Sequence, residues 1–99
     1  MSETTQMPAA VSASVALDIG PGHGALVIYP GERYRGREIE ISRLDGSEHR
    51  THTGVHERTT HAGSMLTAIF GSVPAGEYLV DDGEATVTIA EGAVTELQL

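Results

Sequence analysis

Histidines gather in one short segment of this chain. His49, His52, His56 and His61 lie between residues 49 and 61, and the remaining histidine is His23. Imidazole binds zinc, copper or nickel through a ring nitrogen, and it is the side chain that gains or loses a proton near neutral pH. Metal binding or proton transfer is therefore to be expected in this segment before any other.

The residues between the histidines decide how the rings are displayed. A helix would place His49, His52 and His56 on one face, but the threonines and the glycine between them are weak helix formers. A strand is therefore predicted. On one strand His52 and His56 share a face about 13 Å apart, which is too far for one ion whose nitrogen ligands lie about 2.0–2.1 Å away.

A β-hairpin would bring two of the histidines together. If residues 57–60 form its loop, His56 faces His61 and His52 faces Met65 at the next rung. Opposed side chains in a hairpin have Cβ atoms about 5 Å apart, so two imidazoles could share an ion. The predicted ligands of a zinc, copper or nickel ion are then His56, His61, His52 and, at a greater distance, His49.

The same segment has two other interpretations. It could be a solvent-exposed polar strand face, or it could be a contact surface for a protein partner or a second copy of the chain. In the second case protonation would add positive charge opposite the partner. The hairpin register also places Val55 with Leu66, Ala68 and Phe70 on the core side.

Length and composition limit the classes of function. The 99 residues are enough for one domain with a single core, and the absence of cysteine excludes disulfides and thiolate chemistry. The formal net charge of −8 argues against nucleic acid and anionic membranes as partners. No apolar stretch approaches the roughly 20 residues of a membrane span, and the polar start lacks the pattern of a signal peptide. We expect no membrane insertion and a cytoplasmic location.

Glycine-containing turns separate short apolar or alternating segments, a pattern typical of all-β domains. Residues 25–29 form a continuous apolar run and are predicted to lie in the middle of a sheet, whereas Ile39 and Ile41 alternate with acids and should face the core. No window shows a 3.6-residue period. We expect a flexible tail over residues 1–14 and a single antiparallel β-sandwich of about seven strands over residues 15–99.

Three further features could do chemistry. The Gly20-Pro-Gly-His-Gly24 run resembles a phosphate-binding loop, but a strand rather than a helix follows it, so a turn is predicted. No serine lies in a Gly-x-Ser-x-Gly elbow. Tyr34 lies among Arg33, Arg35 and Arg37, which could contact an anion or could simply be solvated charge balanced by nearby glutamates.

Two resemblances add to this interpretation. The run Val73-Pro-Ala-Gly-Glu-Tyr-Leu-Val80 resembles the entry to a late strand in transthyretin-like and carboxypeptidase-regulatory-like domains, which implies a transthyretin-like or immunoglobulin-like sandwich. Several stretches, including Arg50-Thr-His-Thr-Gly-Val-His-Glu-Arg58, resemble a group of small actinobacterial proteins, some of them labelled phospholipase. That label implies a lipid or ester hydrolase, but it implies no catalytic residue in this chain.

The sequence thus favours a small non-enzymatic binding or accessory module that acts through the histidine-rich strand and its hairpin, with a protein partner or a homo-oligomer. The alternative is a metal-binding protein that uses the four histidines. A phospholipase-like hydrolase is the third interpretation.

Overall fold

The computed structural model describes residues 19–45 and 49–99. These residues form eight strands and two short 3₁₀ turns in the order β1 (His23–Tyr29), η1 (Glu32–Tyr34), β2 (Glu38–Arg43), β3 (Arg50–Gly54), β4 (His56–Thr60), β5 (Gly63–Pro74), β6 (Gly76–Val80), η2 (Asp81–Gly83), β7 (Ala85–Ile89) and β8 (Val94–Gln98). The all-β prediction is confirmed. The tail predicted over residues 1–14 lies outside the described residues. Neither described helical turn is long and apolar enough to cross a membrane.

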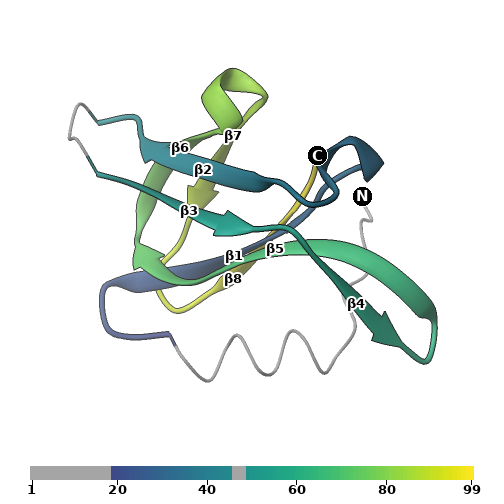
Figure 1. Ribbon diagram of the computed structural model, residues 1–99. Helices are drawn as coiled ribbons and strands as arrows, with labels where there is room; N and C mark the ends of the chain where they lie inside the picture. Colours follow the sequence, from purple (N-terminus) through teal and green to yellow (C-terminus); the bar gives the residue numbers. More distant parts are fainter. Residues whose placement is uncertain (1–18, 46–48) are drawn as a thin grey trace.

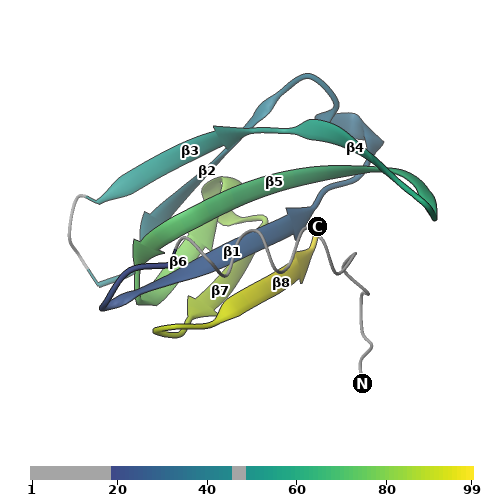
Figure 2. The ribbon, with the colours of Figure 1, turned by 90° about the horizontal axis from the view of Figure 1, so that it is seen from below.

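The strands form two sheets of four, which lie face to face in Figures 1 and 2. One sheet has the order β4-β5-β1-β8 and the other has the order β3-β2-β6-β7. Strands β1 and β8 run parallel to each other, so the prediction of a purely antiparallel arrangement is wrong at this pair. The first and last described strands can pair in parallel because the whole domain lies between them as the crossover connection.

The core lies between the sheets and is aliphatic with a few aromatic rings. On β2 the alternation of Ile39 and Ile41 with glutamates leaves both isoleucines 0% exposed, as the period-2 pattern predicts. On β1, Leu26 and Ile28 face the same core. The apolar run of β1 is buried on both sides of its sheet, and the strand lies between β5 and β8 as predicted.

The chain changes sheets between β3 and β4. Both strands belong to one extended ribbon, but β3 pairs with β2 in one sheet and β4 pairs with β5 in the other (Figure 1). Val55 lies at the change, where its side chain is 7% exposed and its N–H donates to the Arg37 carbonyl at 2.9 Å. Its packing with Leu66, Ala68 and Phe70 in one core cluster confirms the predicted orientation.

The Pro-Ala-Gly-Glu-Tyr run forms the corner into β6. The Tyr78 hydroxyl donates to the Pro74 carbonyl at 2.6 Å, and the ring is fully buried. Gly76 has φ +151°, and a Cβ at this position would approach the Arg43 guanidinium, which lies over the Tyr78 ring at 5.7 Å. The glycine therefore permits both the turn and the packing of arginine against tyrosine.

Candidate functional site

Two of the candidate histidines lie on or beside β3. His49 precedes the strand, is exposed, and meets the Tyr78 ring edge-on with 6.3 Å between ring centroids. His52 lies in the middle of β3 on the outer face of its sheet, and its Nε2 is 3.9 Å from Glu38 Oε1 on β2. The outer face of this sheet is polar because acids and bases alternate with the buried isoleucines.

The other two histidines mark the two ends of β4. His56 begins the strand and faces Thr67 of β5, whereas His61 lies in the turn beyond Thr60. The predicted loop over residues 57–60 is wrong, because these residues are paired strand. His56 and His61 therefore do not face each other, and His52 does not face Met65.

The position of the turn has a local cause. The Thr60 hydroxyl accepts a hydrogen bond from the Ala62 N–H at 3.1 Å and donates to the Gly63 carbonyl at 3.2 Å, so it closes a tight turn over His61 and Ala62. Gly63 has φ +116°, a conformation that side chains rarely adopt. Thr59 and Thr60 are β-branched and favour strand over loop, which extends β4 to the turn.

This arrangement separates the proposed metal ligands. His52 and His56 belong to different sheets, and β4 holds His56 and Thr60 about 13 Å apart at its two ends. Within residues 19–45 and 49–99, no three His, Asp or Glu side chains are grouped so that they could hold a metal ion.

The second half of the histidine segment, strand β4, is an edge strand of its sheet. Among the described strands β4 pairs only with β5, and its residues from His56 to Thr59 are exposed. Figure 2 shows the β4–β5 hairpin reaching beyond the ends of β1 and β8. An edge strand carries a row of unpaired backbone donors and acceptors that a further strand can use.

The hairpin pattern determines which backbone groups point outward. The pair Thr60–Gly63 closes the two-residue turn, and such a closing pair exchanges both backbone hydrogen bonds. Alternation then gives ladder bonds to the even-numbered residues of β4. The N–H and C=O groups of Glu57 and Thr59 therefore point away from β5, toward the free edge.

Side chains fix β4 from two directions. Arg58 donates through Nε to the buried Thr67 hydroxyl at 3.1 Å. Arg35 contacts Glu57 at 3.0 Å and Glu32 at 2.7 Å, which joins the β1–β2 connection to β4. Hydrogen bonding by both glutamates raises the pKa of Arg35, and the same contact lowers the pKa of Glu32. These contacts connect β4 to β5 and to the β1–β2 connection.

A second polar cluster lies around Tyr34. Its ring is 1% exposed, with Arg33 at 4.5 Å and Arg37 at 5.8 Å from the ring centroid. The hydroxyl donates to Asp81 Oδ2 at 2.6 Å, and burial together with this carboxylate raises the pKa of Tyr34 to about 12. Arg33 also pairs with Glu84 at 2.8 Å. The cluster joins η1 to η2, so its arginines are partnered rather than simply solvated.

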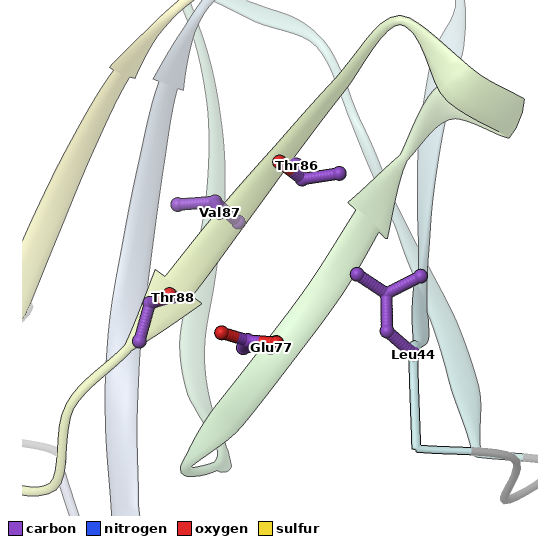
Figure 3. A pocket seen from close by; sticks show the side chains of 5 residues that line it. All are labelled: Leu44, Glu77, Thr86, Val87 and Thr88. Carbon is purple, nitrogen blue, oxygen red and sulfur yellow. The ribbon is translucent and has the colours of Figure 1, made fainter.

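A shallow pocket lies on the outer face of β6 and β7. Its volume is about 160 Å³, whereas ligand pockets usually measure about 300–1,000 Å³. Figure 3 shows the side chains that line it, which are Leu44, Glu77, Thr86, Val87 and Thr88. The pocket is too small for a cofactor, and it lies on the sheet that does not contain β4.

The comparisons with known proteins bear on the fold. No protein-family model matches the chain, and no curated protein matches it. A solved structure that is similar is a leucine-rich repeat protein from Bacteroides thetaiotaomicron, with 13% identity and a TM-score of 0.53 over 79% of this chain. This chain spans only 12% of that structure. At this identity the likeness concerns the fold alone.

Sequence reasoning missed Glu57 and Thr59, the two residues whose backbone defines the free edge. The available signal was the Thr59-Thr60 pair followed by Ala62-Gly63, which favours strand followed by a turn.

Proposed function

We propose that this domain is a small non-enzymatic protein-binding module whose partner adds an extended strand to the free edge of β4. The observation that supports the proposal is the exposed edge at Glu57 and Thr59, on a strand anchored by Arg35 and Thr67. Strand addition obtains affinity from backbone hydrogen bonds and specificity from side chains on the two faces.

The side chains of β4 provide both faces with recognition groups. Alternation places His56 and Arg58 on the outer face of their sheet and Glu57 and Thr59 on the opposite side. A partner strand would therefore meet basic groups on one face and an acid with a hydroxyl on the other. An exposed edge without such a partner is a liability for a folded protein, so a dedicated partner gives it a use.

The fold class that accords with this role is a transthyretin-like or immunoglobulin-like sandwich. Two facing sheets of four described strands and the Tyr78–Pro74 corner support that assignment, because a tyrosine that bonds back to the preceding turn is a hallmark of immunoglobulin-like domains. The absence of cysteine accords with the proposed cytoplasmic location, because structural disulfides are rare in that compartment.

The test of this function is a selection of random dodecapeptides on the immobilised full chain, followed by affinity measurement with two variants. Thr59→Pro removes the outward N–H without removing a ladder bond, because proline is tolerated where the N–H faces away from the sheet. Thr59→Val is the matched control, since both variants lose the Thr59–Ser64 hydroxyl contact of 3.3 Å.

Selected peptides should lose at least about 10-fold in affinity with Thr59→Pro, which corresponds to about 1.4 kcal/mol, and should bind Thr59→Val as they bind the wild type. Equal binding to all three proteins would contradict the proposal. Zinc and copper titrations and an esterase assay on the same samples test the metal-binding and hydrolase alternatives directly. If a second copy is the natural partner, Thr59→Pro should convert a dimer to a monomer in sedimentation.

A further inference from the structure

The outer face of the β4-β5-β1-β8 sheet has an apolar row along β1, although this face points away from the core between the sheets. On β1, the side chains of Ala25, Val27 and Tyr29 alternate with those of the core-facing Leu26 and Ile28, so they lie on the outer face. They are nevertheless 0%, 0% and 6% exposed. The outer face of the opposite sheet, by contrast, carries the charged groups described above.

The described neighbours in the sheet cannot account for this burial. Met65, Ile69 and Val94 pack against the row, but they belong to β5 and β8, so they lie beside it rather than above it. Val27 has Ile69 on one side and Glu96 on the other, with neighbouring strands about 4.8 Å away. Side chains that stand parallel at that spacing leave their ends open, so a fully hidden valine requires a cover.

The Tyr29 hydroxyl gives an independent indication of the same cover. It is buried and has no hydrogen-bond partner among the described residues. Desolvation by burial, reinforced by the charge of Glu96, raises the pKa of Tyr29 to about 12. Buried tyrosine hydroxyls usually find a partner, so the group that covers this face should bring a polar atom to Tyr29.

We propose that the outer face of this sheet is the docking site for the chain's own residues 1–18. Ile19, where the description of this end of the chain begins, already packs against Ala25, Val27 and Tyr29, so the preceding residues start at the edge of the apolar row. That segment supplies apolar side chains, including Val11, Val15 and Leu17, and carries only Glu3 and Asp18 as charged side chains. A docked segment closes the apolar face and leaves the β4 edge open. The proposal does not depend on the function of β4.

The absence of cysteine permits a direct test on the full chain. A nitroxide attached to Ser14→Cys should strongly weaken the methyl NMR signals of Ala25, Val27 and Ile69. It should leave the signal of Leu79, which lies on the outer face of the opposite sheet, nearly unchanged. A nitroxide at the exposed Leu44→Cys serves as the control, because it should not weaken the Val27 signal.

Two results would overturn the proposal. Equal signal loss at Val27 and Leu79, or no loss at either, would show that residues 1–18 do not lie on this face. Loss at Val27 that arises only when spin-labelled chain is mixed with separately methyl-labelled chain would show that the cover is a second copy. As a further readout, Val15→Asp with Leu17→Asp should increase the fluorescence of an apolar dye, and Thr4→Asp with Thr5→Asp should not.

Discussion

The Tyr34–Asp81 hydrogen bond offers the clearest quantitative prediction. Tyr34→Phe removes the hydroxyl that donates to Asp81 Oδ2 at 2.6 Å but keeps the buried ring and its contacts with the two arginines. A hydrogen bond to a charged group contributes about 1.5–3 kcal/mol. Asp81 is only half-buried and can bind water instead, so we expect the lower half of this range.

Urea unfolding followed by circular dichroism measures this loss. A domain of this size is stable by about 5–15 kcal/mol, and its free energy of unfolding falls by about 1–3 kcal/mol per molar urea. The midpoint of the Tyr34→Phe variant should therefore fall by roughly 1 M. In a double-mutant cycle with Asp81→Gly, most of the loss should be a coupling energy between the two residues. Glycine is the suitable partner variant because it removes the acceptor and tolerates the φ of +52° at this position.

The same bond predicts a dependence on alkaline pH. Burial and the Asp81 carboxylate raise the pKa of Tyr34 from 10.0 to about 12 in the folded protein. Between these values the unfolded chain loses the phenol proton while the folded chain keeps it, so stability is full below pH 10 and is lost as pH rises toward 12. The difference between wild type and Tyr34→Phe should therefore shrink over this window. A variant within about 0.5 kcal/mol of wild type at pH 7, the usual range for a neutral surface change, would refute the argument.

Four other substitutions test the packing and the surface ion pairs. Gly24→Ala would drive a methyl group into the Ala90 carbonyl and should cost about 1–3 kcal/mol in thermal unfolding, whereas Gly20→Ala meets no atom of the described residues within 4 Å and should change little. Ile41→Ala removes a side chain that is 0% exposed and should cost about 2–5 kcal/mol in urea unfolding. Arg35→Ala breaks two exposed ion pairs and should lower the free energy of unfolding by no more than about 1 kcal/mol. A larger loss would mean that Arg35 stabilises more of the domain than the position of β4.

Much of the fold could be predicted because it is encoded locally. The alternation around Ile39 and Ile41 and the apolar run of β1 identify their strands, and the core-facing role of Val55 follows from its neighbours. Asp81-Asp82-Gly83 also forms a turn of the kind that aspartate and glycine favour, and both aspartates adopt positive φ there. Each of these features depends on residues close together in the sequence.

The features that could not be predicted depend on distant contacts. The sequence predicts one strand up to a loop over residues 57–60, and nothing local shows that the ribbon changes sheets where the Val55 N–H donates to the Arg37 carbonyl. The parallel pairing of β1 with β8 joins the two ends of the described domain. The buried environment of Tyr34 likewise needs Asp81, which is 47 residues away.

In the candidate site, too, some features could be predicted from the sequence and others could not. The outward orientation of the histidine segment could be inferred from its polar composition, and the structure describes His52 and His56 as exposed. The register of the hairpin could not be inferred. The Thr60 hydroxyl places the turn at His61 and Ala62, so each residue of β4 faces a different residue of β5 than predicted. The separation of His56 from His61 follows from that shift alone.

Amide hydrogen exchange in a complex with a selected peptide is the most direct measurement of the proposed strand addition. The outward N–H groups of Glu57 and Thr59 should exchange rapidly in the free protein and become strongly protected when the peptide binds. The neighbouring N–H of Arg58, already bonded within the hairpin, should change much less. Protection that leaves Glu57 and Thr59 unchanged and falls on another strand would contradict binding at the β4 edge.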